Sequence, residues 1–315
     1  MKYEVVIPVM IAFAISAVLG PIVIPFLRRL KVGQTERAEL ESHLKKNGTP
    51  TMGGLMILAS IVVTSLLYVK DYPKIIPILF MTVGFGVIGF LDDYIKVILK
   101  RNLGLTAKQK FSLQFIVAVV FTVWFVASGV ISTEVKIPFT GIEFDFGYFY
   151  IPFTVLVMLA TVNSVNLTDG LDGLATSVTI VIGIFYMIIS NMRGHDAVAL
   201  YSSALIGGLF GFLIFNKYPA KVFMGDTGSL FLGGAVCSMA LYTKQPIILI
   251  IIGLVYVIES LSVIIQVTYF KKTGKRIFKM SPIHHHFEMC GWSESKIVSV
   301  FVVVTIMLCV VGYFA

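Results

Sequence analysis

The aspartates are the residues of this chain whose type and spacing most clearly indicate chemistry. Of eight in total, five occur in three short motifs that end or interrupt long apolar runs. They are Asp92 and Asp93 in residues 90–94 (FLDDY), Asp169 and Asp172 in residues 166–173 (NLTDGLDG), and Asp226 in residues 223–229 (FMGDTGS). Mg²⁺ typically binds one or two carboxylates together with substrate phosphates and water. The motifs therefore predict Mg²⁺-assisted phosphate chemistry, provided that the fold brings them together.

The first and third motifs differ in their expected place on a helix. Asp92 and Asp93 come at the end of an apolar run, where acids oppose the helix dipole and need a compensating partner. Adjacent helical residues point about 100° apart, so one of the pair can face a metal while the other faces another group. Asp226 precedes a helix start, where an Asp can also serve as an ordinary cap.

The second motif combines acids with glycines, which let a backbone approach a ligand closely. Asp169 and Asp172 would share one face if the segment were helical. A simple capping loop would need only one aspartate. Phe223 of the third motif can stack on a nucleobase or anchor in the membrane interface.

Several cationic and polar residues accompany the acids. Lys46 and Lys108 are placed to meet phosphate charge, although lysines in such loops also set membrane orientation. The three histidines 284–286 lack zinc-site spacing, so phosphate or sugar binding is the better interpretation. Glu259 and Gln266 recur on one face of an apolar helix, which indicates a functional site or polar packing between helices.

The elements that must position these residues are membrane helices. The chain is 57% hydrophobic and 13% charged, whereas soluble domains carry roughly 25% charged residues. A spanning helix needs about 20 apolar residues. Runs near this length predict ten helices within one membrane domain, residues 1–315: 3–27, 52–69, 75–91, 107–128, 151–165, 174–190, 198–215, 229–243, 247–270 and 297–314.

The positive charges predict the orientation of these helices. Of the 25 Lys and Arg residues, 19 lie in the segments that follow the odd-numbered runs. Basic loops face the cytoplasm, so we expect both termini outside and the five clustered aspartates at the cytoplasmic face. The net charge of +8 therefore reflects a membrane rather than a nucleic-acid partner. On the outer side, alternation around Thr140-Gly141 in residues 129–150 predicts a short β-hairpin.

These motifs together resemble one family over essentially the whole chain, the polyprenyl-phosphate N-acetylhexosamine-1-phosphate transferases. Within it, the similarity is greatest to the branch that uses UDP-N-acetylmuramoyl-pentapeptide. The residues that carry the resemblance are 48–54 (GTPTMGG), 89–94 (GFLDDY), 163–173 (NSVNLTDGLDG), 223–229 (FMGDTGS), 282–287 (PIHHHF) and Gly291-Trp292.

The resemblance implies a ten-helix enzyme of the bacterial inner membrane, commonly a homodimer, with a cytoplasmic active site that uses Mg²⁺. Its substrates would be UDP-N-acetylmuramoyl-pentapeptide and undecaprenyl phosphate, and its products lipid I and UMP. By motif, the implied catalytic residues are Asp92, Asp93, Asp226, Lys108 and His285, with Asp226 holding the metal. The implied substrate-binding residues are Lys46, Asn166, Asp169, Asp172, Asn216, Phe223, Gln266, His284 and His286.

Three other classes of function fit the sequence less well. A sister enzyme that uses UDP-N-acetylglucosamine would share the aspartates and the metal, but the Pro-x-His-His-His loop and the following Gly-Trp argue against it. A secondary transporter would carry its polar site near the bilayer midplane, whereas here only Glu259 lies deep in a run. A structural membrane protein would not need five clustered aspartates. Direct attack by the lipid phosphate, with Asp92 as base, is favoured over a covalent enzyme intermediate.

Overall fold

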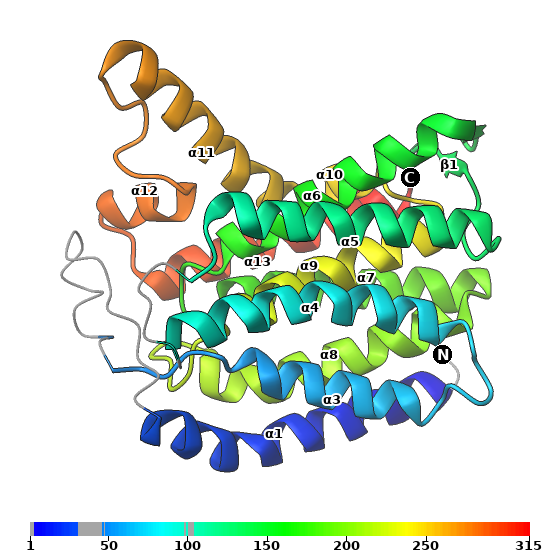
Figure 1. Cartoon of the computed structure of the whole chain (residues 1–315), viewed down its shortest axis with the longest axis horizontal. Helices are drawn as coiled ribbons and strands as arrows, with labels where there is room; N and C mark the ends of the chain where they lie inside the picture. The colour runs from blue at the N-terminus through cyan, green and yellow to red at the C-terminus, as the bar shows by residue number, and fades with distance from the viewer. Residues whose placement is uncertain (1–2, 31–45, 47, 98, 100–103) are drawn as a thin grey trace.

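The computed structural model describes residues 3–30, 46, 48–97, 99 and 104–315. Most of its helices run side by side along one direction (Figure 1). The long helices are α1 (Val6–Arg29), α3 (Gly54–Leu66), α4 (Ile75–Val97), α5 (Ala107–Ala127), α6 (Tyr150–Thr168), α7 (Leu174–Arg193), α8 (Asp196–Asn216), α9 (Gly225–Tyr242), α11 (Leu254–Thr273) and α13 (Glu294–Tyr313). The shorter elements are η1 (Tyr3–Val5), β1 (Glu134–Lys136), β2 (Glu143–Asp145), η2 (Gly147–Phe149), α10 (Leu249–Ile252) and α12 (Ile283–Met289).

The prediction of an all-α polytopic membrane protein is confirmed. Among the described residues, eight helices are long and apolar enough to cross a membrane. The predicted runs 52–69 and 229–243 correspond to α3, a shorter apolar helix of 13 residues, and α9, which has 18 residues. Each of the ten predicted runs thus contains a helix, while ten crossings of the membrane stay a prediction.

Helix α9 forms the centre of the helical layer. Small residues such as Gly233 and Gly234 let neighbouring helices approach it closely, as is common between membrane helices. A Cβ atom on Gly233 would lie 2.5 Å from the Cα atom of Val162 on α6. Phe231 and Leu230 extend from α9 into the two hydrophobic clusters of the molecule. Packing from both sides therefore fixes the position of the helix start that carries Asp226.

The periphery is apolar and exposed, as expected of a surface in contact with lipid. On α1, Met10, Val18 and Ile22 are each more than 60% exposed, although they are large hydrophobic residues. Helix α11 leans away from the other helices towards its carboxyl end, and α12 follows beside it (Figure 1). This end of the layer also contains the ends of α4, α6 and α8, so the loops that carry the sequence motifs lie together there.

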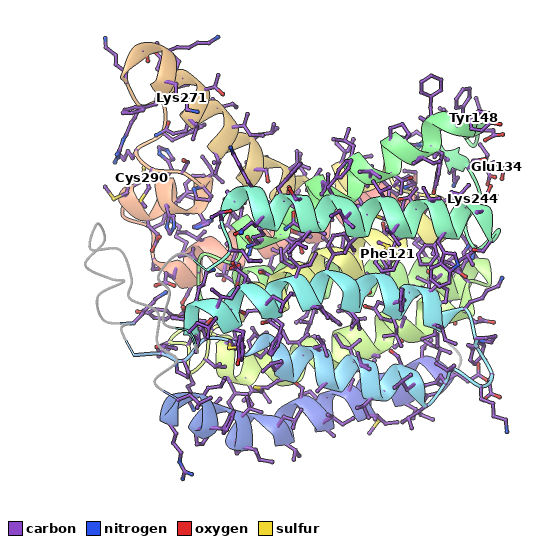
Figure 2. The ribbon with its side chains drawn as sticks, in the orientation of Figure 1. Phe121, Glu134, Tyr148, Lys244, Lys271 and Cys290 are labelled. Atoms are coloured by element: carbon purple, nitrogen blue, oxygen red, sulfur yellow. The ribbon has the colours of Figure 1, made fainter. Side chains whose placement is uncertain are left out.

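The predicted hairpin is present at the opposite end of the layer. Strands β1 and β2 pair antiparallel, with Val135 opposite Phe144, and the N–H of Ile137 donates to the carbonyl of Ile142. Lys244 forms ion pairs with Glu134 and Glu143, one on each strand, and Figure 2 shows Lys244 beside Glu134. The hairpin is thereby tied to the chain that follows α9.

Both chain ends lie at the hairpin end of the layer (Figure 1). The N–H of Phe139 donates to the carbonyl of Ala315 at 3.4 Å, which holds the last residue against the hairpin. The location of these ends outside the cell stays a prediction.

Candidate active site

Three carboxylates from two helices meet at the loop-bearing end of the layer. Asp92 and Asp93 near the end of α4 and Asp226 in the first turn of α9 each offer an oxygen, and these oxygens lie within 4.8 Å of one another. Gly89 makes the approach possible, because a Cβ atom there would lie 2.0 Å from the carbonyl oxygen of Asp226. The glycine in the α4 motif thus allows the two helices to bring their acids together.

Asp93 joins α4 to the start of α9. Its Oδ1 accepts a hydrogen bond from the Asp226 N–H at 3.1 Å, and its Oδ2 accepts from the N–H and hydroxyl of Thr227 at 2.8 and 2.6 Å. A carboxylate at a helix amino terminus also meets the positive end of the helix dipole. Both oxygens of Asp93 therefore have partners that hold Asp226 in place.

Asp92 and Asp226 share a lysine. The Nζ of Lys96 lies 2.5 Å from Oδ2 of Asp92 and 2.6 Å from Oδ2 of Asp226. Lys110 approaches the same Asp226 oxygen at 3.1 Å, and the Leu105 N–H donates to Oδ1 of Asp92 at 2.7 Å. The two acids are thus held by positive charge, and any further cation must compete with Lys96 for the same oxygens.

Asn166 connects the end of α6 to this cluster. Its amide nitrogen donates to Oδ1 of Asp226 at 2.7 Å and to the Ser229 hydroxyl at 2.8 Å, while its amide oxygen accepts from Lys110 at 3.3 Å. The last turn of α6 therefore orients the α9 carboxylate from the side opposite to α4.

The donor set fits a hard divalent cation. Carboxylate oxygens are the ligands that Mg²⁺ and Ca²⁺ prefer, and the Asp92, Asp93 and Asp226 cluster can bind a metal ion. The oxygens of all three acids already accept hydrogen bonds or ion pairs, but of the three only Asp226 also lines the adjoining cavity, so Asp226 is the ligand best placed to hold it. Mg²⁺ tolerates such a small protein ligand set because it keeps several waters.

A polar cavity of about 230 Å³ adjoins the carboxylates. Its lining comes from four stretches of the chain: Lys46, Asn166, Asp169, Gly170, Leu171, Asp172, Asn216, Phe223, Gly225 and Asp226. The five clustered aspartates of the sequence therefore do converge, with Asp226 belonging both to the metal-ligand cluster and to the cavity wall.

Lys46 lines this cavity and forms ion pairs with two acids. Its Nζ lies 2.7 Å from Asp172 and 2.7 Å from Glu294 at the start of α13. Burial by itself lowers the pKa of Lys46, but hydrogen bonds and charges from the two acids outweigh it and raise that pKa above the ordinary value. Lys46 is therefore a cation throughout the physiological pH range.

The ionised form of the Asp169 carboxyl is disfavoured in this site. Burial raises the pKa of Asp169 well above its usual range, and the nearby charges of Asp226, Asp93 and Asp172 raise it further. The segment 169–173 is a turn between α6 and α7 rather than a helix, so Asp169 and Asp172 face the same cavity through loop geometry.

Phe223 and Asn216 reach the cavity from the loop between α8 and α9. The Phe223 backbone is held by Pro50 at 2.8 Å and Gly53 at 2.9 Å, which leaves its ring half-buried at the cavity wall. Asn216 is buried, and its amide accepts from Thr176 at 2.8 Å and donates to the Val222 carbonyl at 3.1 Å. Asn216 thus supports the loop as well as lining the cavity.

The three histidines have separate environments. His284 is fully buried, its Nδ1 lies 3.0 Å from Oε2 of Glu259 on α11, and a Cβ atom on Gly170 would lie 2.2 Å from its Nε2. His285 pairs with Glu288 at 2.6 Å, and the Nδ1 of His286 accepts from the Lys279 N–H at 3.1 Å. His284 therefore packs against Gly170 of the cavity wall without itself lining the cavity.

Like the three histidines, Gln266 and Lys108 are outside the cavity lining. The amide of Gln266 accepts from the N–H groups of Ile277 and Phe278, both at 3.0 Å, and donates to the Phe278 carbonyl at 2.9 Å. Lys108 is exposed on the first turn of α5. Their contacts with substrate stay predictions.

Comparison of the chain with known proteins identifies its family. The glycosyl transferase family 4 model matches residues 75–244, and signature 1 of the phospho-N-acetylmuramoyl-pentapeptide-transferases matches residues 46–58. The phospho-N-acetylmuramoyl-pentapeptide-transferase of Bacillus subtilis is 51% identical over 320 residues, with 100% of this chain and 98% of the relative covered. The chain belongs to the phospho-N-acetylmuramoyl-pentapeptide-transferase family.

Two other members of this family are also similar to this chain over most of its length. The Clostridium perfringens strain 13 protein of that name is 52% identical over 312 residues, with 98% of each chain covered. The Halalkalibacterium halodurans protein is 54% identical over 296 residues, with 92% of this chain and 91% of the relative covered. The resemblance inferred from the motifs is therefore confirmed.

Three residues of this transferase site were missed by sequence reasoning. Lys96 follows Asp92 by four positions, so helical spacing could have placed both on one face. Lys110 comes two residues after Lys108 and contacts Asp226. Glu294 follows Trp292 by two residues but is 248 positions from Lys46, and only the packing of α13 beside the turn after α6 brings the two together.

Proposed function

We propose that this chain transfers phospho-N-acetylmuramoyl-pentapeptide from its UDP-linked donor to undecaprenyl phosphate, giving lipid I and UMP in peptidoglycan synthesis. The observation that carries this proposal is the cavity beside the Asp92, Asp93 and Asp226 cluster. The aromatic wall at Phe223 suits a nucleobase, and the carboxylate cluster suits a cation that accompanies a diphosphate.

The reaction exchanges one phosphoanhydride for another and needs no ATP. An oxygen of the lipid phosphate attacks the phosphorus bonded to the sugar, the bond from that phosphorus to the UMP oxygen breaks, and UMP leaves. Such a transfer depends on positioning and on neutralisation of charge. We propose direct attack, without a covalent enzyme intermediate.

The side chains of the site have distinct parts in this scheme. Lys96 and Lys110 lie beside Asp226 and can meet the negative charge of the diphosphate. Asp92, whose oxygens contact Lys96 and the Leu105 N–H, accepts the proton of the lipid phosphate. Asp226 would hold Mg²⁺, which supplies positive charge for the UMP leaving group.

We propose one membrane domain in the bacterial inner membrane, with the cavity open to the cytoplasm, where positively charged loops accumulate, and a homodimer as the assembly. The polyprenyl chain would lie against exposed apolar residues in the first half of α11, such as Ile258 and Leu261.

The sister activity on UDP-N-acetylglucosamine is the alternative to be tested. Purified protein with Mg²⁺ and undecaprenyl phosphate should release UMP from UDP-N-acetylmuramoyl-pentapeptide and very little from UDP-N-acetylglucosamine. The measurement is UMP release with each donor at matched concentration. Equal release from both donors would move the assignment to the broader family. Release from neither would contradict the proposed transfer.

A further inference from the structure

The carboxyl end of α11 and the chain that follows it form an arm, residues 264–281, with a strong positive charge. It contains five basic residues, all exposed: Lys271, Lys272, Lys275, Arg276 and Lys279. The sequence has no Asp or Glu from residue 260 to residue 287. Figure 2 shows Lys271 on the part of α11 that extends beyond the other helices.

The charge of the arm is not neutralised within the described part of the molecule. The polar contacts of its long side chains are to backbone carbonyls, with Arg276 donating to Lys279 at 3.4 Å and Lys279 donating to Met289 at 2.9 Å. No salt bridge among the described residues involves these five side chains. Basic clusters of this size beside a membrane helix attract anionic lipid headgroups.

The arm contains a cleft of about 320 Å³. It is lined by Gln266, Val267, Phe270, Lys271, Arg276, Met280 and Ser281. Two cations and a hydroxyl therefore stand beside three apolar side chains, which matches a phosphate joined to an acyl chain. None of these residues lines the active-site cavity.

The cleft is held open by a buried side chain. Gln266 is 7% exposed, and its amide binds the backbone of Ile277 and Phe278 in three hydrogen bonds of 2.9 to 3.0 Å. The chain that returns from α11 is therefore fixed against the helix. Lys271 and Arg276 face the same space because this backbone connection sets the distance between their segments.

The cleft continues into the lipid-facing side of α11. Val267 and Phe270 are 44% and 49% exposed, and Ile264 one turn earlier is 59% exposed. Apolar exposure on a helix that is long and apolar enough to cross the membrane indicates contact with acyl chains. An occupant with its phosphate at Lys271 and Arg276 can thus extend a chain along α11.

We propose that this cleft binds an anionic phospholipid of the surrounding leaflet, with the phosphate between Lys271 and Arg276 and an acyl chain along Val267 and Phe270. The inference does not rest on the proposed transferase reaction. A polyprenyl phosphate shares the lipid-phosphate chemistry, but the cleft lies outside the cavity and its cluster of acids. We therefore assign it to the bulk lipid.

Native mass spectrometry of the detergent-purified chain with added phosphatidylglycerol tests the site. The variant Lys271→Gln/Arg276→Gln should weaken binding of the first phosphatidylglycerol by about tenfold or more. Lys272→Gln/Lys275→Gln removes the same charge from the same arm outside the cleft, and should retain binding close to that of the unchanged chain. Both variants should keep the unchanged melting temperature, since all four side chains are exposed.

Two results would overturn the assignment. Equal losses in the two double variants would mean that diffuse charge, not the cleft, attracts lipid. Displacement of bound phosphatidylglycerol by an equimolar amount of undecaprenyl phosphate would give the cleft to the polyprenyl phosphate instead. Phosphatidylcholine, which carries no net charge, should bind the unchanged chain no better than it binds the Lys271→Gln/Arg276→Gln variant.

Discussion

Lys96 determines how the acids of the site are arranged. Its ammonium bridges Asp92 and Asp226 at 2.5 and 2.6 Å, so the carboxylates that suit a divalent cation already share a cation from the chain itself. Unit charges about 4 Å apart interact by several kcal/mol at partly buried sites. A metal that binds these oxygens therefore has to displace Lys96, which can then turn to substrate phosphates.

Replacing Lys96 should strengthen metal binding. Lys96→Met removes the competing charge but keeps the length of the side chain, so we expect Mn²⁺ to bind about tenfold more tightly or better. Titration of Mn²⁺ followed by electron paramagnetic resonance measures this without reference to turnover. Lys108→Met removes a charge from an exposed position on the neighbouring helix and should leave the affinity nearly unchanged.

Asp226→Asn provides the second comparison for that titration. It removes the carboxylate shared by the cluster and the cavity, so Mn²⁺ binding should be lost. Unchanged or weaker Mn²⁺ binding by Lys96→Met would show that Lys96 does not occupy the cation position.

At the scale of the elements, the site depends on how closely α4 and α9 approach. Gly54 and Gly89 both face the first turns of α9: a Cβ atom on Gly54 would lie 2.2 Å from the backbone nitrogen of Gly228. Backbone atoms cannot rotate out of the way as a side chain does. The glycines of the motifs are therefore required for packing between helices and, through that packing, for the position of Asp226.

A methyl group on Gly89 should separate the two helices. Gly89→Ala would place Cβ 2.0 Å from the Asp226 carbonyl oxygen, and overpacking of this kind costs about 1–3 kcal/mol. We expect a lower melting temperature together with weaker Mn²⁺ binding. Gly86→Ala on the same helix meets only side-chain atoms, the nearest at 3.1 Å, and should change both quantities less. An equal effect of the two substitutions would contradict the role given to Gly89.

At the scale of the whole molecule, the candidate active site lies at one end of the helical layer and the hairpin lies at the other. The carboxylates, cavity and basic arm share one end of the helical layer, and the hairpin and both chain ends share the other (Figure 1). Lys and Arg also concentrate in the loops of the first end, which the positive-inside rule assigns to the cytoplasm.

Cysteine labelling should reveal this orientation. Cys290 is exposed at the active-site end and would itself react, so it is first replaced by Ser. In that background, Thr140→Cys in the hairpin turn should react with a membrane-impermeant maleimide added to intact spheroplasts. Met280→Cys in the arm should react only after the membrane is permeabilised. The reverse pattern would place the active-site cavity on the outer side of the membrane and contradict the proposed use of a cytoplasmic donor.

Much of this protein could be predicted because its constraints are local in the sequence. Apolar runs near the thickness of a bilayer predicted the helices, alternation around Thr140-Gly141 predicted the hairpin, and the motifs indicated Asp92, Asp93 and Asp226 as partners in one site. In a bilayer the backbone must satisfy its hydrogen bonds within each segment, so length and polarity determine the secondary structure almost alone.

Only the tertiary structure decided which polar groups meet. Glu294 reaches Lys46 across 248 positions, Lys96 rather than Lys108 joins the carboxylates, and Gln266 holds the arm instead of lining the cavity. These contacts follow from helix rotations and close glycine approaches, which depend on packing between distant segments. Periodicity shows which face of a helix is polar, but the partner of that face is set by van der Waals contact with helices far away in the chain.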